Sequence, residues 1–231
     1  MEVIILAGGK GTRLQSVVSD VPKPMADISG KPFLEYLLTY IATFEVSRFV
    51  LSIGYKKDTI REYFRESFQG IPISYAIEDE PLGTGGAIIE SLKYIKSKSF
   101  LLLNGDSFLQ VSLRDLQRQF QENSSDIEMV LKPMEDFERY GSVILDGESV
   151  IGFQEKKYQK SGLINGGIYL MKTSLFHQDF PRKFSFESDF LEKNISDLKI
   201  NAYLCNGYFV DIGVPSDYLQ AQIDLPKVVG V

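Results

Sequence analysis

The sequence predicts an α/β fold with a mixed, mostly parallel sheet flanked by helices. In the first half of the chain, short apolar runs alternate with segments whose apolar residues recur at helical spacing, which is the pattern of βαβ units. A glycine-rich turn follows the first apolar run directly, as at the carboxyl end of a buried parallel strand. After about residue 128 hairpin signals replace the alternation, so we expect small β-hairpin additions there.

Four apolar runs and four amphipathic segments make up the first half. Each run is short enough for a buried strand, and each is followed by apolar residues with a period near 3.6. We therefore expect strands at residues 3–6, 49–53, 73–77 and 100–103, and helices around residues 33–41, 60–64, 87–95 and 113–120. This alternation predicts a Rossmann-like arrangement.

The second half is predicted to hold two hairpins, a strand and a final helix. Asp146-Gly147 is a hairpin turn pair between residues 143–145 and 150–153, and Asn206-Gly207 has the same form between residues 203–204 and 209–210. Residues 168–171 have the composition of a strand. The last helix is expected to begin at Pro215, because proline is favoured in a first turn, and to reach Ile223.

Composition restricts the classes of partner. The net charge of -6 disfavours a nucleic-acid or membrane-surface partner, either of which would require a basic face. No apolar run approaches the about 20 residues needed to cross a bilayer, and we expect no signal peptide because the chain enters a core strand at once. The single cysteine, Cys205, cannot form an intramolecular disulfide and favours a reducing, cytoplasmic location. An oligomer is compatible with the composition, which does not specify one.

The glycine-rich turn after the first predicted strand has the features of an anion-binding loop. Gly8, Gly9 and Gly11 let the backbone approach a phosphate closely and direct several N–H groups at it. Arg13 and Lys23 add charge-assisted donors nearby. The spacing fits neither the Gly-x4-Gly-Lys-Ser/Thr phosphate loop nor the dinucleotide-binding fingerprint.

Two aspartates follow apolar runs. Asp106 comes after the predicted strand 100–103, in Asn104-Gly105-Asp106, and Asp211 follows a second run far downstream. Ligands of open α/β sheets gather at the carboxyl ends of strands, and Mg²⁺ prefers a few carboxylates together with phosphate oxygens and water. Each aspartate could instead cap a turn. Because both accompany the glycine loop, we favour a shared Mg²⁺ site at Asp106 and Asp211.

Two other polar groups have an ordinary interpretation beside the functional one. Glu155-Lys156 could hold a sugar hydroxyl and a second phosphate, or could be a solvated surface pair. Asn165-Gly166-Gly167 could offer its amide to sugar hydroxyls, or could form a turn before the next strand. Their residue patterns alone leave both questions open.

The acidic run Glu78-Asp79-Glu80 lies between a predicted strand and a predicted helix. Acidic residues near a helix start suit the helix dipole, which is the ordinary explanation for all three. A carboxylate can also accept both the N1–H and the 2-amino group of guanine, whereas uracil, thymine and adenine present acceptors to it. If one of these acids contacts a base, guanine is favoured.

Taken in order, these motifs resemble the sugar-1-phosphate nucleotidyltransferase (NDP-sugar pyrophosphorylase) family from Val3 to about Tyr218. The matching segments are residues 6–14, 22–25, 81–84, 104–106, 153–156 and 210–213. Within the family, residues 78–84 and 162–169 are similar to the mannose-type guanylyltransferases. Residues 184–191 are most similar to the D-glycero-α-D-manno-heptose 1-phosphate guanylyltransferases.

The resemblance implies a role for each matched residue. Those implied for the nucleotide are Leu6, Ala7, Gly8, Gly9, Gly11, Thr12, Arg13, Lys23, Glu78, Gly83, Thr84 and Asp106, with Glu78 as the acid that contacts the base. Those implied for the sugar phosphate are Asn104, Gly141, Glu155, Lys156, Asn165 and Glu187. The implied catalytic groups are Arg13, Lys23, Asp106, Lys156 and Asp211, with Asp106 and Asp211 as ligands of Mg²⁺. The chain is then expected to be one domain, with a nucleotide-binding half at about residues 1–127 and a sugar-phosphate-binding half at about residues 128–231.

The implied reaction transfers GMP from GTP to a sugar 1-phosphate and gives a GDP-sugar and pyrophosphate, with Mg²⁺ as cofactor. The implied sugar is D-glycero-α-D-manno-heptose, for a surface polysaccharide such as capsule or lipopolysaccharide. The alternatives are a mannose 1-phosphate guanylyltransferase or another hexose 1-phosphate nucleotidyltransferase. A non-catalytic nucleotide-binding regulatory subunit is a further alternative, disfavoured because both aspartates and both lysines are present.

Overall fold

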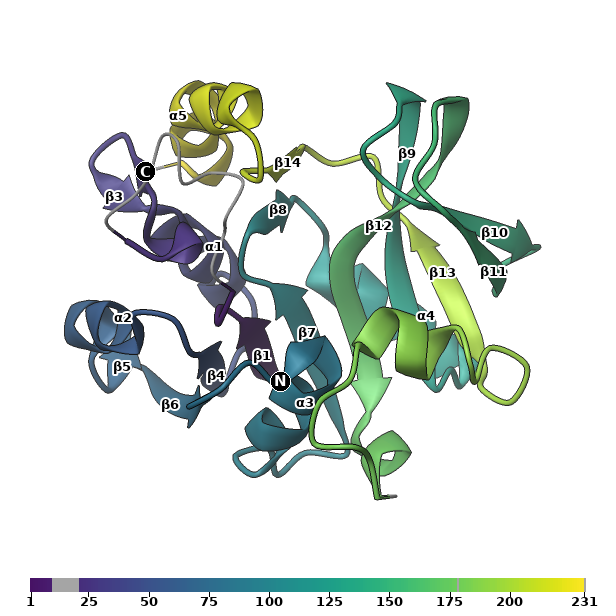
Figure 1. Ribbon diagram of the computed structural model, residues 1–231, viewed down its shortest axis with the longest axis horizontal. Coiled ribbons are helices and arrows are strands. Elements are labelled where there is room, and N and C mark those ends of the chain that lie inside the picture. Colours follow the sequence, from purple (N-terminus) through teal and green to yellow (C-terminus); the bar gives the residue numbers. More distant parts are fainter. Residues whose placement is uncertain (10–20, 178, 231) are drawn as a thin grey trace.

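The computed structural model describes residues 1–9, 21–177 and 179–230, and one twisted sheet of ten strands runs through it (Figure 1). In spatial order the strands are β10 (Ser142–Asp146), β11 (Ser149–Gln154), β13 (Ile200–Leu204), β9 (Ile127–Phe137), β12 (Gln159–Lys172), β7 (Ser99–Asn104), β1 (Glu2–Leu6), β4 (Arg48–Ile53), β6 (Ile71–Ile77) and β5 (Ser67–Phe68). The neighbours β7, β1, β4 and β6 are parallel. This confirms the predicted α/β fold and its first four strands.

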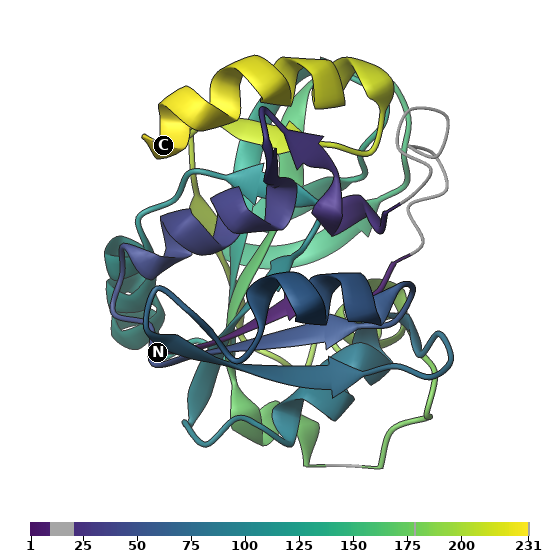
Figure 2. The same ribbon diagram turned by 90° about the vertical axis from the view of Figure 1, so that its left-hand side faces the viewer.

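Helices cover both faces of the sheet. On one face lie α1 (Phe33–Ala42), α2 (Lys57–Phe64), α4 (Leu113–Asn123) and α5 (Pro215–Val229), and on the other lie α3 (Gly83–Leu92) and the π-helix η4 (Phe186–Leu191). Successive side chains of β1 point to opposite faces of the sheet. Val3 and Ile5 pack in the core on the face of α1, α2, α4 and α5, and Ile4 packs in the core on the face of α3 and η4. Figure 2 shows α1 and α5 side by side. The five predicted helices are confirmed, and the last one extends past Ile223 to Val229.

Shorter elements complete the fold around the ends of the parallel strands. They are the 3-10 turns η2 (Lys23–Met25) and η3 (Thr173–Phe176), the pair β2 (Asp27–Ile28) and β3 (Lys31–Pro32), and the pair β8 (Ser107–Leu109) and β14 (Phe209–Asp211). Within the three described ranges, none of the helices has both the length and the apolar character required to span a membrane.

The hairpin predicted at Asn206-Gly207 is wrong. The strand before it, β13, is a parallel neighbour of β9 in the main sheet, whereas β14 pairs antiparallel with β8 in a separate small sheet. A Cβ on Gly207 would overlap the carbonyl oxygen of Gln110, so glycine is required where the chain passes the end of β8. As a result Asp211 pairs with Ser107, the residue next to Asp106.

The hairpin at Asp146-Gly147 is confirmed by β10 and β11. Asn165-Gly166-Gly167, for which the sequence left open a turn before a strand, does not form that turn. These residues lie inside the long strand β12, where its register with β9 shifts between Asn165 and Tyr169. Gly167 adopts a left-handed conformation with φ of +72°, and a Cβ there would lie 2.8 Å from Asn104 Nδ2. The segment is therefore a β-bulge in β12 that lies against Asn104, the last residue of β7.

Candidate active site

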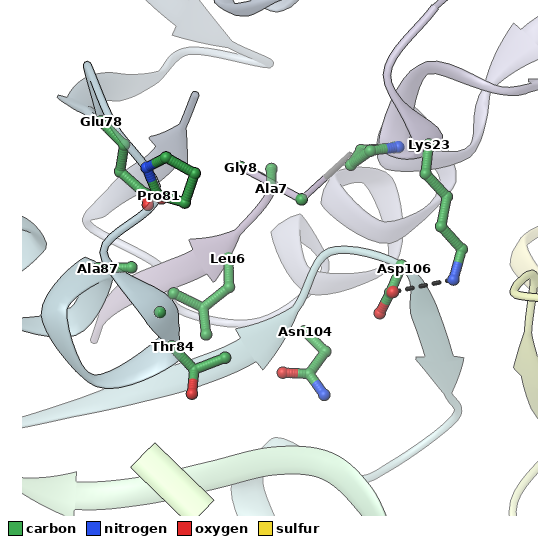
Figure 3. Close-up of a pocket in the computed structure, with 13 residues that line it drawn as sticks. Leu6, Ala7, Gly8, Lys23, Glu78, Pro81, Thr84, Ala87, Asn104 and Asp106 are labelled. Carbon is green, nitrogen blue, oxygen red and sulfur yellow. Dashed lines mark hydrogen bonds and ion pairs between the residues drawn. The ribbon is translucent and has the colours of Figure 1, made fainter. Parts of the chain in front are cut away.

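The carboxyl ends of β1 and β7 border a cavity of about 420 Å³ (Figure 3). Its lining residues are Leu6, Ala7, Gly8, Gly9, Lys23, Pro24, Glu78, Pro81, Gly83, Thr84, Ala87, Asn104 and Asp106. Every described residue that the sequence implied for the nucleotide lies in this lining. Gly11, Thr12 and Arg13 lie outside the described residues.

Glu78 is the acid of its run that faces this cavity. It follows β6 directly, and its carboxylate accepts a hydrogen bond from Ser52 Oγ at 2.9 Å and one from the backbone N–H of Leu82 at 3.2 Å. Asp79 and Glu80 instead form ion pairs with basic side chains at the surface. Of the three acids, Glu78 is the one that lines the cavity.

The ammonium group of Lys23 lies between two carboxylates. Its Nζ is 2.9 Å from Asp106 Oδ2 and 3.2 Å from Asp211 Oδ1, and its side chain is only 10% exposed. The 3-10 turn η2 presents Lys23 from one side, and the pairing of β8 with β14 brings the two aspartates together. The backbone N–H of Gly213 also donates to Asp211 Oδ1, at 2.8 Å.

The two carboxylates beside Lys23 are suited to hold a divalent cation. Two carboxylates already share one positive charge, and Asp106 Oδ1 and Asp211 Oδ2 are not used by these contacts. No cluster of three or more His, Cys, Asp or Glu that could hold a metal occurs in the described part of the chain. Mg²⁺ suits such a sparse set, because it commonly takes one or two carboxylates and fills its other positions with phosphate oxygens and water.

A second cavity, of about 410 Å³, adjoins the first at Asn104. Its lining residues are Asn104, Tyr140, Gly141, Ser142, Val143, Phe153, Gln154, Glu155, Lys156, Asn165, Glu187 and Glu192. All six residues that the sequence implied for the sugar phosphate are among them. Sequence reasoning assigned no role to Gln154, although it lies in the matched segment 153–156, or to Glu192, which lies in none of the matched segments.

Glu155 and Lys156 follow β11 and are exposed at the edge of this second cavity. Neither forms an ion pair or hydrogen bond with another residue in the described ranges. Asn165, in the bulge of β12, accepts a hydrogen bond from the backbone N–H of Gly167 at 3.0 Å and donates one to the hydroxyl of Tyr169. Burial raises the pKa of the Tyr169 hydroxyl, which therefore stays protonated.

One hydroxyl joins the walls of the two cavities. Thr84 Oγ1 donates to Glu187 Oε2 at 2.8 Å and accepts from the backbone N–H of Phe186 at 2.8 Å. Ser185 Oγ also lies within hydrogen-bond distance of Glu187 Oε2, at 3.3 Å. The other oxygen of Glu187 is not used by these contacts, and Glu187 belongs to the lining of the second cavity.

The glycines at the start of α3 have a structural role that the sequence analysis missed. A Cβ on Gly83 or Gly85 would overlap Phe184, and one on Gly86 would lie 2.5 Å from the carbonyl oxygen of Arg182. The glycines therefore let residues 182–187 pack directly on the first turn of α3. Three glycines so close to a helix start were the available signal, because glycine disfavours helix and implies a compensating close approach.

The profile of the nucleotidyl transferase family matches residues 2–228. The chain belongs to the nucleotidyl transferase family. This nucleotidyl transferase is 49% identical to the D-glycero-alpha-D-manno-heptose 1-phosphate guanylyltransferase of Campylobacter jejuni over 221 residues, which cover 94% of this chain and 97% of that protein. It is 45% identical to the protein of the same name from Aneurinibacillus thermoaerophilus over 226 residues, covering 97% and 98% of the two chains.

Solved structures are also similar to this chain. The nucleotidyl transferase superposes on crystalline HddC from Yersinia pseudotuberculosis with a TM-score of 0.86 and 39% identity, covering 96% of this chain and 97% of that one. The HddC complex with GMP-PN gives a TM-score of 0.85 at the same identity and coverage. The family resemblance predicted from the motifs is thereby confirmed.

Proposed function

We propose that this nucleotidyl transferase transfers GMP from GTP to D-glycero-α-D-manno-heptose 1-phosphate, with GDP-heptose and pyrophosphate as products. The observation that carries the proposal is the pair of adjoining cavities that share Asn104. One is lined by residues that the family resemblance implies for the nucleotide, and the other by residues that it implies for the sugar phosphate. The heptose is supported by the two full-length relatives named as heptose 1-phosphate guanylyltransferases. The guanine nucleotide is supported by the GMP-PN complex of HddC.

Within the first cavity, Glu78 contacts the guanine base. Its carboxylate accepts the N1–H and the 2-amino group as a bidentate, charge-assisted partner. The backbone N–H groups of Gly8, Gly9 and Gly11, together with Thr12 and Arg13, hold the triphosphate. Leu6, Ala7 and Gly83 enclose the base.

Members of this family generally use a divalent metal ion, and we assign Mg²⁺ to Asp106 and Asp211. The support is the pair of carboxylates that already share the charge of Lys23. The ion would supply positive charge against the phosphates of the nucleotide at this point of the cavity.

Transfer itself requires positioning and charge neutralisation. A phosphate oxygen of the sugar 1-phosphate attacks the α-phosphorus of GTP in line, the new P–O bond forms, and the bond to pyrophosphate breaks on the opposite side. Because the nucleophile is already an anion, no general base is needed. Lys156 holds the sugar phosphate, Lys23 contacts the reacting phosphates, and Arg13 stabilises the departing pyrophosphate. Asn165, Glu187, Glu155 and Gly141 orient the sugar.

The test is a panel of nucleoside triphosphates against a panel of sugar 1-phosphates, with Mg²⁺ present and pyrophosphate release followed. We expect the highest kcat/KM for GTP with the manno-heptose 1-phosphate, well above that for mannose 1-phosphate. A higher kcat/KM for another pair would overturn the assigned substrate and keep the transfer mechanism. Release with no pair would overturn the proposed activity.

A further inference from the structure

Ser52 is a buried serine at the carboxyl end of β4 that no motif of the sequence singles out. It has 0% exposure, and its hydroxyl donates a hydrogen bond of 2.9 Å to Glu78 Oε1. The backbone N–H of Glu78 donates to the carbonyl of Ile53 at 2.8 Å, so the main chain of Glu78 is also fixed to β4. Ser52 therefore holds the carboxylate from the strand beneath it.

Two further contacts restrict the same carboxylate. The backbone N–H of Leu82 donates to Oε2 at 3.2 Å. A Cβ on Gly8 would lie 2.5 Å from Oε1, so the β1 loop touches the carboxylate from a third side. Each oxygen thus has one protein donor and keeps a lone pair for a ligand.

We propose that Ser52 is a positioning residue for base selectivity, which rests on the proposed contact of Glu78 with guanine. The terminal torsion of a glutamate is broad, so an unrestrained carboxylate plane samples many orientations. Contact with N1–H alone tolerates such rotation, because one oxygen suffices. Contact with N1–H and the 2-amino group together does not, because both oxygens must lie in the plane of the base. Ser52 fixes that plane, and its hydroxyl therefore favours guanine over a purine without the 2-amino group.

Inosine triphosphate isolates this effect. It has the same triphosphate and the same N1–H as GTP and lacks only the 2-amino group. We expect the wild-type enzyme to prefer GTP over ITP by about tenfold or more in kcat/KM, as for one charge-assisted hydrogen bond. In Ser52→Ala the GTP/ITP ratio is expected to fall about three- to tenfold, with a raised KM for GTP and little change in kcat. Both nucleotides are assayed on one preparation, so the folded fraction cancels from the ratio.

The matched control is Ser91→Ala. Ser91 is also 0% exposed, but its hydroxyl donates to the carbonyl of Ala87 inside α3 at 2.8 Å. Its removal is expected to leave the GTP/ITP ratio unchanged. Ser52→Cys, with a weaker donor of similar size, is expected to give an intermediate ratio and supplies the test if Ser52→Ala does not fold.

The variant Glu78→Gln distinguishes a failure of the role proposed for Ser52 from a failure of the proposed contact between Glu78 and guanine. If Glu78→Gln lowers the GTP/ITP ratio while Ser52→Ala and Ser52→Cys leave it unchanged, the role of Ser52 is overturned and the contact of Glu78 with guanine stands. If Glu78→Gln also leaves the ratio unchanged, the proposed contact with the base is itself overturned. An equal fall in Ser91→Ala would show a general effect of losing a buried hydroxyl and would overturn the role of Ser52.

Discussion

The hydroxyl of Thr84 donates a hydrogen bond of 2.8 Å to the carboxylate of Glu187, 103 positions further along the chain. Thr84 lines the cavity proposed for the nucleotide, and Glu187 lines the cavity proposed for the sugar phosphate. The same hydroxyl accepts from the backbone N–H of Phe186, so the first turn of η4 is attached to the first turn of α3. The orientation of a sugar-cavity carboxylate thus depends on a residue of the other cavity.

Replacing Thr84 by valine removes both hydrogen bonds and keeps the shape of the side chain. We expect the KM for the sugar 1-phosphate to rise about tenfold, the loss for one hydrogen bond to a charged group, and to exceed any rise in the KM for GTP. Thr84→Ser retains the hydroxyl and should stay near the wild type. Steady-state kinetics with each substrate varied in turn provide the measurement. An unchanged KM for the sugar 1-phosphate in Thr84→Val would contradict the link.

Asp106→Asn should reduce turnover about a hundredfold or more with little effect on folding. The substitution halves the negative charge that Asp106 and Asp211 place around Lys23 and weakens the proposed Mg²⁺ site. The carboxyl of Asp106 is half-exposed, so the melting temperature should stay within a few degrees. Asp115→Asn, at a surface pair with Arg118, is the control. Near-normal turnover in Asp106→Asn would rule out the metal assignment.

Removal of divalent metal should stop pyrophosphate release, and Mg²⁺ should restore it. The reason is that two anionic substrates must meet, and the lysines offer fewer positive charges than the phosphates carry. Activity is measured after dialysis against EDTA and again during a titration with Mg²⁺. In Asp211→Asn the concentration of Mg²⁺ for half-maximal activity should rise. Undiminished release in EDTA would exclude the requirement.

Gly85→Ala should destabilise the fold, because its Cβ would overlap the ring of Phe184. Overpacking of this kind costs about 1–3 kcal/mol in free energy of unfolding. Gly152→Ala is the matched control, since a Cβ there would make an ordinary contact of 3.4 Å with Ile144 Cδ1. Urea unfolding of the three proteins measures the difference. Equal free energies of unfolding for the two variants would contradict this prediction and show that the Phe184 ring moves aside without destabilising the fold.

Glu128 is a fully buried carboxyl beneath α4. Burial raises its pKa above the ordinary 4.5, and the charge of Glu148 acts in the same direction. Hydrogen bonds from Ser125 and Gln119 and the charge of Lys199 oppose the rise without cancelling it. The folded protein therefore binds this proton more tightly than the unfolded chain does.

Protonated Glu128 makes its full contribution to the free energy of unfolding below about pH 4.5, and this contribution is lost as the pH rises through the pKa of Glu128 in the folded protein. Glu128→Gln does not titrate and keeps an oxygen for the donor of Gln119. On going from pH 4.5 to pH 7, wild type should lose free energy of unfolding relative to this variant. Denaturant unfolding at the two pH values gives the comparison, in which other titrating groups cancel. A parallel dependence in the two proteins would contradict the raised pKa.

Local patterns were sufficient to predict the parallel part of the sheet and the place where a site could form. Strands buried on both faces are apolar runs, so β1, β4, β6 and β7 were visible in the sequence. Their carboxyl ends meet at one edge, which is why Gly8, Glu78 and Asp106 converge on one cavity although they are far apart in the chain.

Pairing between distant segments was not predictable from such patterns. The turn signal Asn206-Gly207 is genuine as a local feature, but β14 pairs with β8 because the chain passes closely over Gln110. The bulge near Asn165 depends on a left-handed Gly167 against Asn104. Ser52 could not be singled out from the sequence, because the role proposed for it depends on its hydrogen bond to Glu78, which forms only in the folded chain.

Asn104 lines both cavities, and it ends a strand whose parallel register with β1 pairs Asn104 with Leu6. The spacing between the cavity proposed for guanosine and the cavity proposed for the sugar phosphate is therefore set at a residue that ends one strand of the main sheet. For a bisubstrate inhibitor that tethers guanosine to a heptose phosphate, the distance that the tether must span between the two proposed cavities is therefore fixed. With a tether matched to that distance, the second end binds at a high effective concentration, and a longer or shorter tether forfeits the gain.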